Sequence, residues 1–314
     1  MEKIKGKNNR TITLSSEEQK ELLSLCIKPE KKIEPFDVSD KVILGNFFQV
    51  AKHLPDAFAD LVIVDPPYNM NKTFNKSTFR KMKDDDYASF TEKWVVETKR
   101  LMRDNASIYV CCDWESSNTI GEVLSRHFVI RNRITWQREK GRGAQKNWKN
   151  GMEDIWFATL SDNYYFDLES VKVRRKVLAP YKQDGVPKDW KETDHGKFRD
   201  TCPSNFWDDI SIPYWSMPEN TEHPTQKPEK LLAKLIIASS KENDLVFDPF
   251  LGSGTTAITS KKLSRHFCGV EIDESYCALA QKRLIKACTD KRIQGYSDGV
   301  FWERNTLQAK SNNK

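Results

Sequence analysis

Residues 245–256 read LVFDPFLGSGTT and carry the clearest structural signal in the chain. A short apolar run at 245–248 ends in an acid, and a helical pattern begins at Thr255. Between them, Gly252 and Gly254 allow backbone N–H groups to approach a ligand closely and point the helix N-terminus at it. A strand, a glycine turn and a helix in this order predict a ligand-binding loop.

A second acid accompanies this loop. Glu271 lies 23 residues past Asp248, near the end of the next apolar strand at 267–272. An acid at that position is suited to hydrogen bonds with ribose hydroxyls. The third glycine of the dinucleotide fingerprint is missing, which disfavours NAD as the ligand. The alternative interpretation is a tight strand–helix turn followed by a solvated acid.

The same strand–helix alternation extends toward the N-terminus. Apolar strands are expected at 42–44, 61–64, 107–111 and 129–136, with helices at 47–54, 90–101 and 117–126. Continuous apolar runs are typical of a parallel sheet that is covered on both faces. The pattern therefore predicts a doubly wound α/β fold. The alternation breaks at residues 137–222, which predicts an irregular insert, and it returns at Pro228.

Composition excludes several classes of protein. The 314 residues include 51 Lys+Arg and 45 Asp+Glu, and the resulting formal charge of +6 points only weakly to nucleic acid. The longest apolar runs are far shorter than the ~20 residues that a membrane-spanning helix requires. Seven Cys without a C-x-x-C pair and five scattered His predict no metal site. The polar start MEKIKGKNNR predicts no secretory signal, so we expect a reduced cytoplasmic protein.

The residues Asp65-Pro66-Pro67-Tyr68 follow directly after the apolar run 61–64. The two prolines fix φ and remove two backbone donors, so the carbonyls there can only accept hydrogen bonds. An acid beside such a carbonyl forms a pair of acceptors for one NH₂ group, and Tyr68 adds a flat face for stacking a base. The alternative, a turn stiffened by proline, explains the prolines but not the acid and the aromatic ring together.

Taken together, these two motifs resemble those of the DNA amino-methyltransferases that use S-adenosylmethionine. The motif at 65–68 precedes the loop at 248–256, with an irregular region between them, which is similar to the permuted β-class order. A third block, HPTQKP at 223–228, matches the family segment that packs beside the cofactor loop. Asn46 stands where the family usually has Asp near the cofactor adenine. The resemblance covers about residues 40–288.

The resemblance implies a Rossmann-like methyltransferase sheet with a target-recognition insert, and it assigns roles along the chain. The expected segments are a basic arm (1–40), a catalytic half (41–136), a target-recognition region (137–222), a cofactor-binding half (223–290) and a tail (291–314). The expected catalytic residues are Asp65, Pro66, Pro67 and Tyr68. The expected cofactor-binding residues are Asn46, Lys227, Asp248, Phe250, Gly252, Ser253, Gly254, Thr255 and Glu271, with Lys227 paired to the cofactor's carboxylate.

A basic cluster opens the insert and is the predicted DNA contact. Residues 131–149 hold seven basic side chains and one acid, Glu139. Neutralising DNA phosphates requires such a cluster, although a charge run is more often a solvated face. The predicted DNA-binding residues are Arg138, Lys140, Arg142, Lys146 and Lys149. The lysine-rich loop at 69–86 is expected to close over a flipped-out base.

Three interpretations remain open, and the first is a DNA amino-methyltransferase that acts on N6 of adenine, with N4 of cytosine as its alternative. Asp-Pro-Pro-Tyr resembles the N6-adenine enzymes, whereas Ser-Pro-Pro-Tyr resembles the N4-cytosine ones. Methyltransferases of RNA or of protein glutamine resemble Asn-Pro-Pro-Tyr in unpermuted order. The third reading is a non-catalytic nucleic-acid-binding Rossmann-like module, against which the intact Asp65, Gly252 and Gly254 argue. Besides double-stranded DNA, the resemblance raises a cognate restriction endonuclease and a second copy of the chain as partners, and the sequence decides neither.

Overall fold

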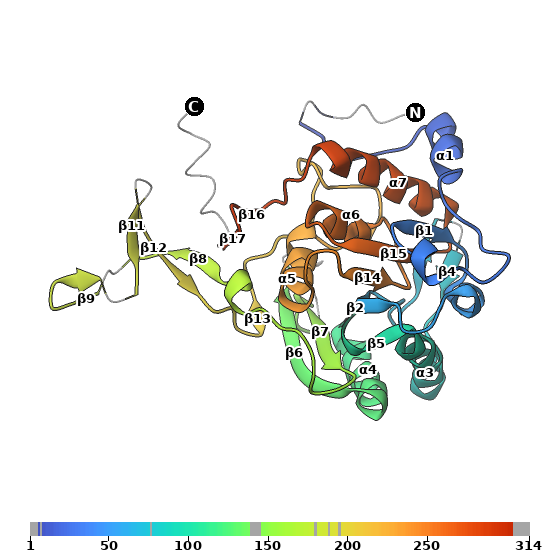
Figure 1. The fold of residues 1–314 in the computed structure, drawn as a ribbon, viewed down its shortest axis with the longest axis horizontal. Helices are drawn as coiled ribbons and strands as arrows, with labels where there is room; N and C mark the ends of the chain where they lie inside the picture. Colours follow the sequence, from blue (N-terminus) through green and yellow to red (C-terminus); the bar gives the residue numbers. More distant parts are fainter. Residues whose placement is uncertain are drawn as a thin grey trace.

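The centre of the protein is an eight-stranded sheet in the order β1-β15-β14-β2-β5-β7-β6-β13 (Figure 1). The computed structural model describes residues 6, 8–75, 77–138, 146–178, 181–187, 189–193 and 196–303. The strands of this sheet are β1 (Lys41–Leu44), β2 (Ala59–Val64), β5 (Met102–Cys112), β6 (Val129–Gln137), β7 (Met152–Thr159), β13 (Phe206–Trp207), β14 (Leu245–Asp248) and β15 (His266–Glu271).

Helices cover both faces of the sheet. They are α1 (Ser16–Leu23), α2 (Phe47–Val50), α3 (Asp84–Leu101), α4 (Trp114–His127), α5 (Glu229–Ser239), α6 (Thr255–Lys262) and α7 (Glu274–Thr289). Successive residues of β2 face opposite sides: Val62 packs with α2, α3 and α4, whereas Leu61 packs with α5. Helices α6 and α7 pack over β1 and β15. Both faces are therefore buried, and the predicted doubly wound α/β fold is confirmed.

The insert is less irregular than its sequence suggests. Residues 152–159, within the predicted insert at 137–222, form β7, which lies antiparallel between β5 and β6. Glu153 and Asp154 stand at the start of this strand and shorten its apolar run, so the sequence pattern did not predict a core strand. Both side chains are nevertheless buried. The predicted loop at 69–86 also contains structure, namely the hairpin of β3 (Lys72–Phe74) and β4 (Ser77–Phe79) and the first turn of α3.

The strands β8 to β12 of the insert form an arm that projects from the body, at the left of Figure 1. It carries a five-stranded sheet in the order β11-β12-β8-β17-β16 and the pair β9–β10. Their bounds are β8 (Val173–Lys176), β9 (Lys182–Gln183), β10 (Val186–Pro187), β11 (Lys191–Thr193), β12 (Gly196–Thr201), β16 (Tyr296–Ser297) and β17 (Val300–Trp302), with a short 3₁₀ turn, η3 (Glu169–Val171), before β8. Because β17 pairs with β8, residues 296–302 of the predicted tail complete this sheet.

The N-terminal segment, expected to be a weakly patterned arm, contains α1. Ser15 and Glu18 form a capping box that starts this helix. Glu18 then pairs with Lys282 on α7, and Gln19 bonds Ser275. Two short 3₁₀ turns, η1 (Pro35–Asp37) and η2 (Ala51–His53), flank β1 and α2. Within the described part of the chain, no helix has the length and apolar character needed to cross a membrane.

Candidate active site

The two sequence motifs meet at one edge of the sheet because β2 and β14 are parallel neighbours. Their carboxyl ends border a cavity of about 270 Å³. The predicted site residues that line it are Asp65, Pro66, Pro67, Tyr68, Lys227, Asp248, Phe250, Gly252, Ser253, Thr255 and Glu271. The structure therefore brings the predicted catalytic and cofactor residues to one cavity, with the exceptions of Asn46 and Gly254.

At one end of the cavity, Asp65 is the acceptor of a compact polar cluster. The Lys227 ammonium donates to both carboxylate oxygens at 2.7 Å, and the Tyr68 hydroxyl donates to Oδ1 at 2.8 Å. Burial opposes the charge on Lys227, but Asp65 and Glu153 outweigh it, so the pKa of Lys227 is raised. Burial, with the same two acids, raises the pKa of Tyr68 well above its usual value. Its hydroxyl is therefore a neutral donor.

Lys227 has a partner within the chain that the sequence did not predict. Sequence reasoning placed its ammonium on the cofactor's carboxylate, whereas the structure places it on Asp65, 162 residues away along the chain. The side chain is only 8% exposed, in the segment that leads into α5. Contact with a cofactor thus stays a prediction, and the observed partner is the carboxylate of Asp65.

Glu153 belongs to the same cluster and was missed in the sequence. It lies on β7 with its side chain 4% exposed, and its Oε2 is 3.3 Å from both the Lys227 ammonium and the Tyr68 hydroxyl. Its Oε1 pairs with Arg138. The signal in the sequence was an acid next to the apolar residues 155–158. An acid that is buried with such residues requires charged partners, which points to a polar cluster.

At the other end of the cavity, two buried acids shape the glycine loop. Asp248 accepts bonds from the Phe250 N–H (3.0 Å) and the Thr256 hydroxyl (2.6 Å). Glu271 accepts from the N–H groups of Gly252 and Asp273, both at 2.7 Å. Burial raises the pKa of Asp248 and of Glu271 to about 7 in each case. The loop geometry thus depends on two carboxyl groups that change their protonation state near neutral pH.

The glycines of the loop have different roles. Gly252 has φ +55°, and a Cβ there would lie 3.1 Å from Nε2 of His223, so this position combines a left-handed backbone with close packing beside the cavity. Gly254, at φ +86°, leaves no room for a Cβ because the Cβ of Ala280 would be 2.6 Å away. It therefore allows α6 to pack against α7 and does not line the cavity.

Asn46 is also outside the cavity lining. Its side chain caps α2 by accepting a bond from the Phe48 N–H at 2.9 Å. The adjacent Gly45 donates its N–H to the Glu271 carbonyl at 2.9 Å. The backbone of this segment is thus hydrogen-bonded to the end of β15, while the Asn46 side chain caps the start of α2.

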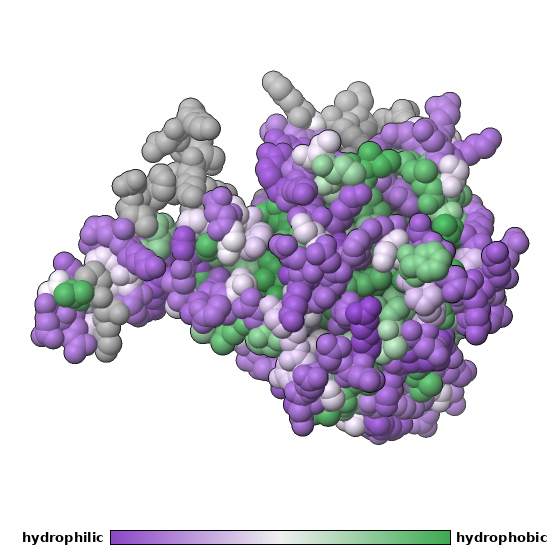
Figure 2. Space-filling view, in the orientation of Figure 1, coloured by the Kyte–Doolittle hydropathy of each residue, from purple (hydrophilic) through white to green (hydrophobic). Residues whose placement is uncertain are grey.

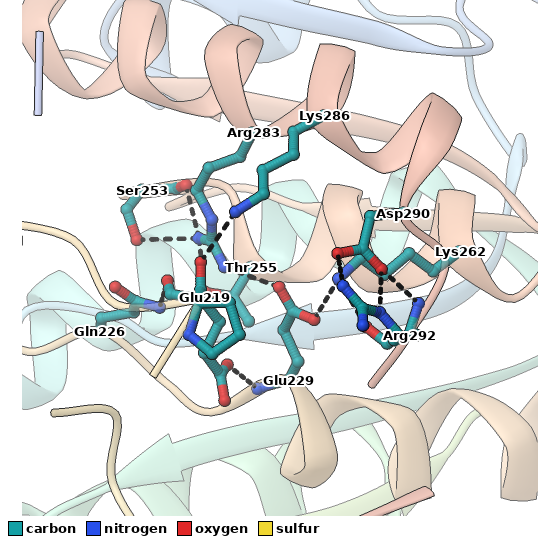
Figure 3. Close-up of polar contacts among 11 residues, drawn as sticks. Glu219, Gln226, Glu229, Ser253, Thr255, Lys262, Arg283, Lys286, Asp290 and Arg292 are labelled. Carbon is teal, nitrogen blue, oxygen red and sulfur yellow. Dashed lines mark hydrogen bonds and ion pairs between the residues drawn. The ribbon is translucent and has the colours of Figure 1, made fainter. Parts of the chain in front are cut away.

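A buried network lies behind the loop (Figure 3). Arg283 on α7 donates to the Ser253 carbonyl at 2.8 Å and the Thr255 hydroxyl at 3.1 Å, and it pairs with Glu229 at 3.2 Å. Glu229, in the first turn of α5, also pairs with Lys262 at 2.6 Å. One arginine thus ties the loop to two helices.

The predicted DNA contacts are only partly placed. Lys140 and Arg142 lie outside the described residues. Lys146 and Lys149 are exposed, as expected of phosphate contacts. Arg138, in contrast, is paired with Glu153 of the polar cluster around Asp65, so its predicted phosphate contact has a competing partner.

The comparisons with known proteins agree with this geometry. The family model described as DNA methylase matches residues 59–282. The chain is 31% identical over 250 residues to the DNA adenine methyltransferase YhdJ of Escherichia coli (strain K12), covering 77% of this chain and 82% of that protein. It is 29% identical to the type II methyltransferase M.HpaI of Haemophilus parainfluenzae, covering 79% and 74%.

Solved structures share the fold. The PvuII DNA methyltransferase (cytosine-N4-specific) superposes with a TM-score of 0.59 at 14% identity, covering 90% of this chain and 93% of that one. The M1.HpyAVI–SAM complex gives 0.51 at 23% identity, covering 77% and 98%. At these identities the likeness concerns the fold alone, whereas the family match extends over most of the chain. The chain is a member of the DNA methylase family.

Proposed function

We propose that the chain is a site-specific DNA methyltransferase that transfers a methyl group from S-adenosylmethionine to the N6 amino group of an adenine flipped out of duplex DNA. The observation that carries this proposal is the shared cavity. Asp65 and Pro66, whose carboxylate and carbonyl would form an acceptor pair for an amino group, line the same cavity as Gly252 and Glu271. The names of the relatives YhdJ and M.HpaI support adenine and a restriction–modification setting.

The residues of the loop fit S-adenosylmethionine. Gly252 keeps the backbone beside the cavity free of a side chain, Glu271 offers a buried carboxylate to ribose hydroxyls, and Phe250 and Ile272 line the cavity with apolar surface for a flat ring. When bound, the cofactor supplies an already activated sulfonium methyl group. The protein's main task is therefore to position a nucleophile in line with it.

Asp65 and Pro66 prepare that nucleophile. The adenine amino nitrogen is a poor nucleophile because its lone pair is delocalised into the ring. By accepting its two N–H bonds, the carboxylate and the carbonyl favour tetrahedral geometry at nitrogen and free the lone pair. Flipping the base out of the duplex costs a few kcal/mol. Stacking against Tyr68, worth ~1–3 kcal/mol, offsets part of that cost.

Modification-specific long-read sequencing of DNA from a host that expresses the chain tests the proposal. We expect N6-methyladenine in one short sequence motif, and none in a host that expresses Asp65→Ala. If N4-methylcytosine is found in that motif instead, the target base is cytosine and the adenine assignment is wrong. Unmodified DNA from a host that accumulates folded protein would overturn the proposed activity.

Cofactor affinity should fall as the pH is lowered from 8 to 6. Burial raises the pKa of Glu271 to about 7, so the carboxylate is ionised above that pH and protonated below it. A proton on Glu271 competes with the N–H bonds from Gly252 and Asp273 and weakens the acceptor offered to ribose. We expect about tenfold weaker binding at pH 6, one pH unit below the pKa.

Calorimetric titration with S-adenosylmethionine at pH 6, 7 and 8 measures this dependence. Glu271→Gln should bind weakly with little pH dependence. Because the pKa of Asp248 is also about 7, Asp248→Asn is the matched control and should retain most of the slope. Affinity that is flat or rises toward pH 6 in the wild type would contradict the assignment of Glu271.

Replacing Arg283 by lysine should weaken cofactor binding about tenfold, because the shorter, unforked cation cannot hold Ser253, Thr255 and Glu229 at once. The charge is retained, so the buried Glu229 keeps a cation nearby and the fold should persist. The measurement is calorimetry beside thermal unfolding, with the exposed Arg126→Lys as control. Unchanged affinity would show that the network is not needed to shape the loop.

The arm and the described part of the basic segment are proposed to contact DNA. The arm's surface is largely hydrophilic in Figure 2, as a DNA-facing element requires. We infer that the predicted target-recognition region, 137–222 without the central-sheet strands β7 and β13, selects the sequence, while Lys146 and Lys149 supply general affinity. Phosphate contacts position a protein, whereas base contacts specify.

Neutralising Lys146 and Lys149 should weaken binding to specific and non-specific duplexes alike. The slope of log affinity against log salt should flatten by about one per charge removed. Salt-titrated binding of Lys146→Ala and Lys149→Ala checks this. Grafting residues 160–205 from a relative with another target should instead change the methylated motif. An active graft that still methylates the original motif would refute this division of the chain.

Two further assignments are proposals. A cognate restriction endonuclease is proposed because M.HpaI and M.BglII are named type II methyltransferases. The cytoplasm is proposed as the location because the substrate is intracellular DNA. A homodimer stays a prediction from the resemblance, and sedimentation of the purified protein with and without duplex DNA measures it.

A further inference from the structure

Lys227 occupies the acceptor that the target amino group requires. Its ammonium bonds both oxygens of Asp65 at 2.7 Å, and Tyr68 adds a second donor on Oδ1. A carboxylate oxygen accepts two hydrogen bonds at its lone pairs, so Oδ1 is full and Oδ2 has one site left. A cation on the carboxylate also weakens it as an acceptor for a neutral amino group. Because the cation weakens the remaining acceptor site, we expect the incoming adenine to displace Lys227 from at least one oxygen.

A displaced Lys227 ammonium needs another partner, because the side chain is only 8% exposed. An unpaired cation at such depth is strongly unfavourable. Among the residues that the structure describes, Glu153 is the other carboxylate in ion-pair contact with it, with Oε2 3.3 Å from Nζ. A shift of about 0.5 Å would complete a normal hydrogen bond there.

Glu153 is placed to accept the displaced Lys227 ammonium. Arg138 pairs with Oε1, which leaves Oε2 directed at Lys227 and Tyr68. The glutamate lies on β7, an interior strand that pairs with β5 and β6, so its position does not depend on a surface loop. The same oxygen also lies 3.3 Å from the Tyr68 hydroxyl, and a Tyr68 hydroxyl released from Asp65 could bond it as well.

We propose that Glu153 is a positioning residue for methyl transfer, which takes over the Lys227 ammonium when the target amino group binds Asp65. The inference rests on the proposed function, because the amino group is the group that displaces Lys227. It assigns Lys227 two positions, one on Asp65 in the free enzyme and one on Glu153 in the complex with DNA. Glu153 touches neither substrate nor cofactor and acts through Lys227.

The first test is the single-turnover methylation rate of Glu153→Gln, with saturating S-adenosylmethionine and a duplex carrying the mapped motif. The amide keeps the size of the side chain but lacks the charge that accepts the ammonium. We expect a rate at least about tenfold lower, with the dissociation constants for duplex and cofactor within about twofold of wild type. Glu122→Gln, an exposed glutamate on α4 that pairs only locally with Arg126, is the control and should match wild type.

A double-mutant cycle with Lys227→Met separates this role from simple charge balance. Without the ammonium, Glu153 has nothing to receive, so Glu153→Gln should slow the Lys227→Met enzyme by less than about twofold. If it slows that enzyme as much as it slows the wild type, the two residues act independently and the proposal is wrong. A Glu153→Gln enzyme that folds and reacts at the wild-type rate would also overturn it.

A structure of the unmutated enzyme decides the matter even if the variant fails to fold. In a complex with the mapped duplex and a non-reactive cofactor analogue, the Lys227 ammonium should lie nearer Glu153 than Asp65. An ammonium that still bonds both Asp65 oxygens beside a bound adenine would refute the exchange. Failure of the wild-type enzyme to methylate the duplex would instead count against the proposed function.

Discussion

Asp65→Ala should lower the single-turnover rate of methyl transfer at least about a hundredfold, the loss typical of removing one preorganised group that acts on the transition state. The carboxylate is one of the two acceptors that orient the amino group, and the Pro66 carbonyl alone cannot pull both N–H bonds. The loss should appear in the chemical step. S-adenosylmethionine affinity should stay near the wild-type value, because the loop acids Asp248 and Glu271 bond within the loop and not to Asp65.

The control for this prediction concerns the buried cation. Removing Asp65 leaves Lys227 with Glu153 as its partner at 3.3 Å, so the cluster keeps a balancing charge and the variant should fold. Thermal unfolding and cofactor calorimetry on the same sample establish that. Methyl transfer by a folded Asp65→Ala enzyme at near the wild-type rate would refute the acceptor mechanism.

The sequence predicted those parts of the site that are local. The motifs at 65–68 and 248–256 each follow a buried strand, and parallel strands bring their carboxyl ends to one edge. Apolar periodicity and turn chemistry are enough to predict this arrangement. The predicted doubly wound sheet was correct for the same reason, because β2 and β14 contain the continuous apolar runs 61–64 and 245–247.

Contacts between residues that are far apart in the sequence could not be predicted in this way. Lys227 pairs with Asp65 across 162 residues, and a lysine before a helix gives no sign of which acid it will meet. Arg283 lies on α7, where a basic residue normally indicates a solvated face, yet it is 3% exposed and bonds the glycine loop at Ser253 and Thr255. The core strand β7 was not predicted because Glu153 breaks the apolar pattern from which strands are predicted.

Gly252→Leu should abolish S-adenosylmethionine binding, and the structure gives two separate reasons. The backbone at this position has φ +55°, which a side chain makes unfavourable by roughly 1–2 kcal/mol. In addition, a Cβ would lie 3.1 Å from the imidazole of His223, so the rest of a leucine side chain is forced toward the cavity. Burial lowers the pKa of His223 to about 4, so its imidazole is neutral near pH 7 and forms an uncharged wall of the cavity.

The matched control is Gly185→Leu, which separates backbone strain from crowding. Gly185 has φ +80°, in the turn between β9 and β10, and nothing lies within 4 Å of a Cβ built there. The variant suffers the same kind of strain but fills no cavity, so it should bind S-adenosylmethionine as the wild type does. Calorimetry on both variants gives the comparison. Unchanged affinity in Gly252→Leu would mean that the loop does not hold the cofactor, and the acceptor role of Asp65 would then need a methyl donor positioned by other residues of the cavity.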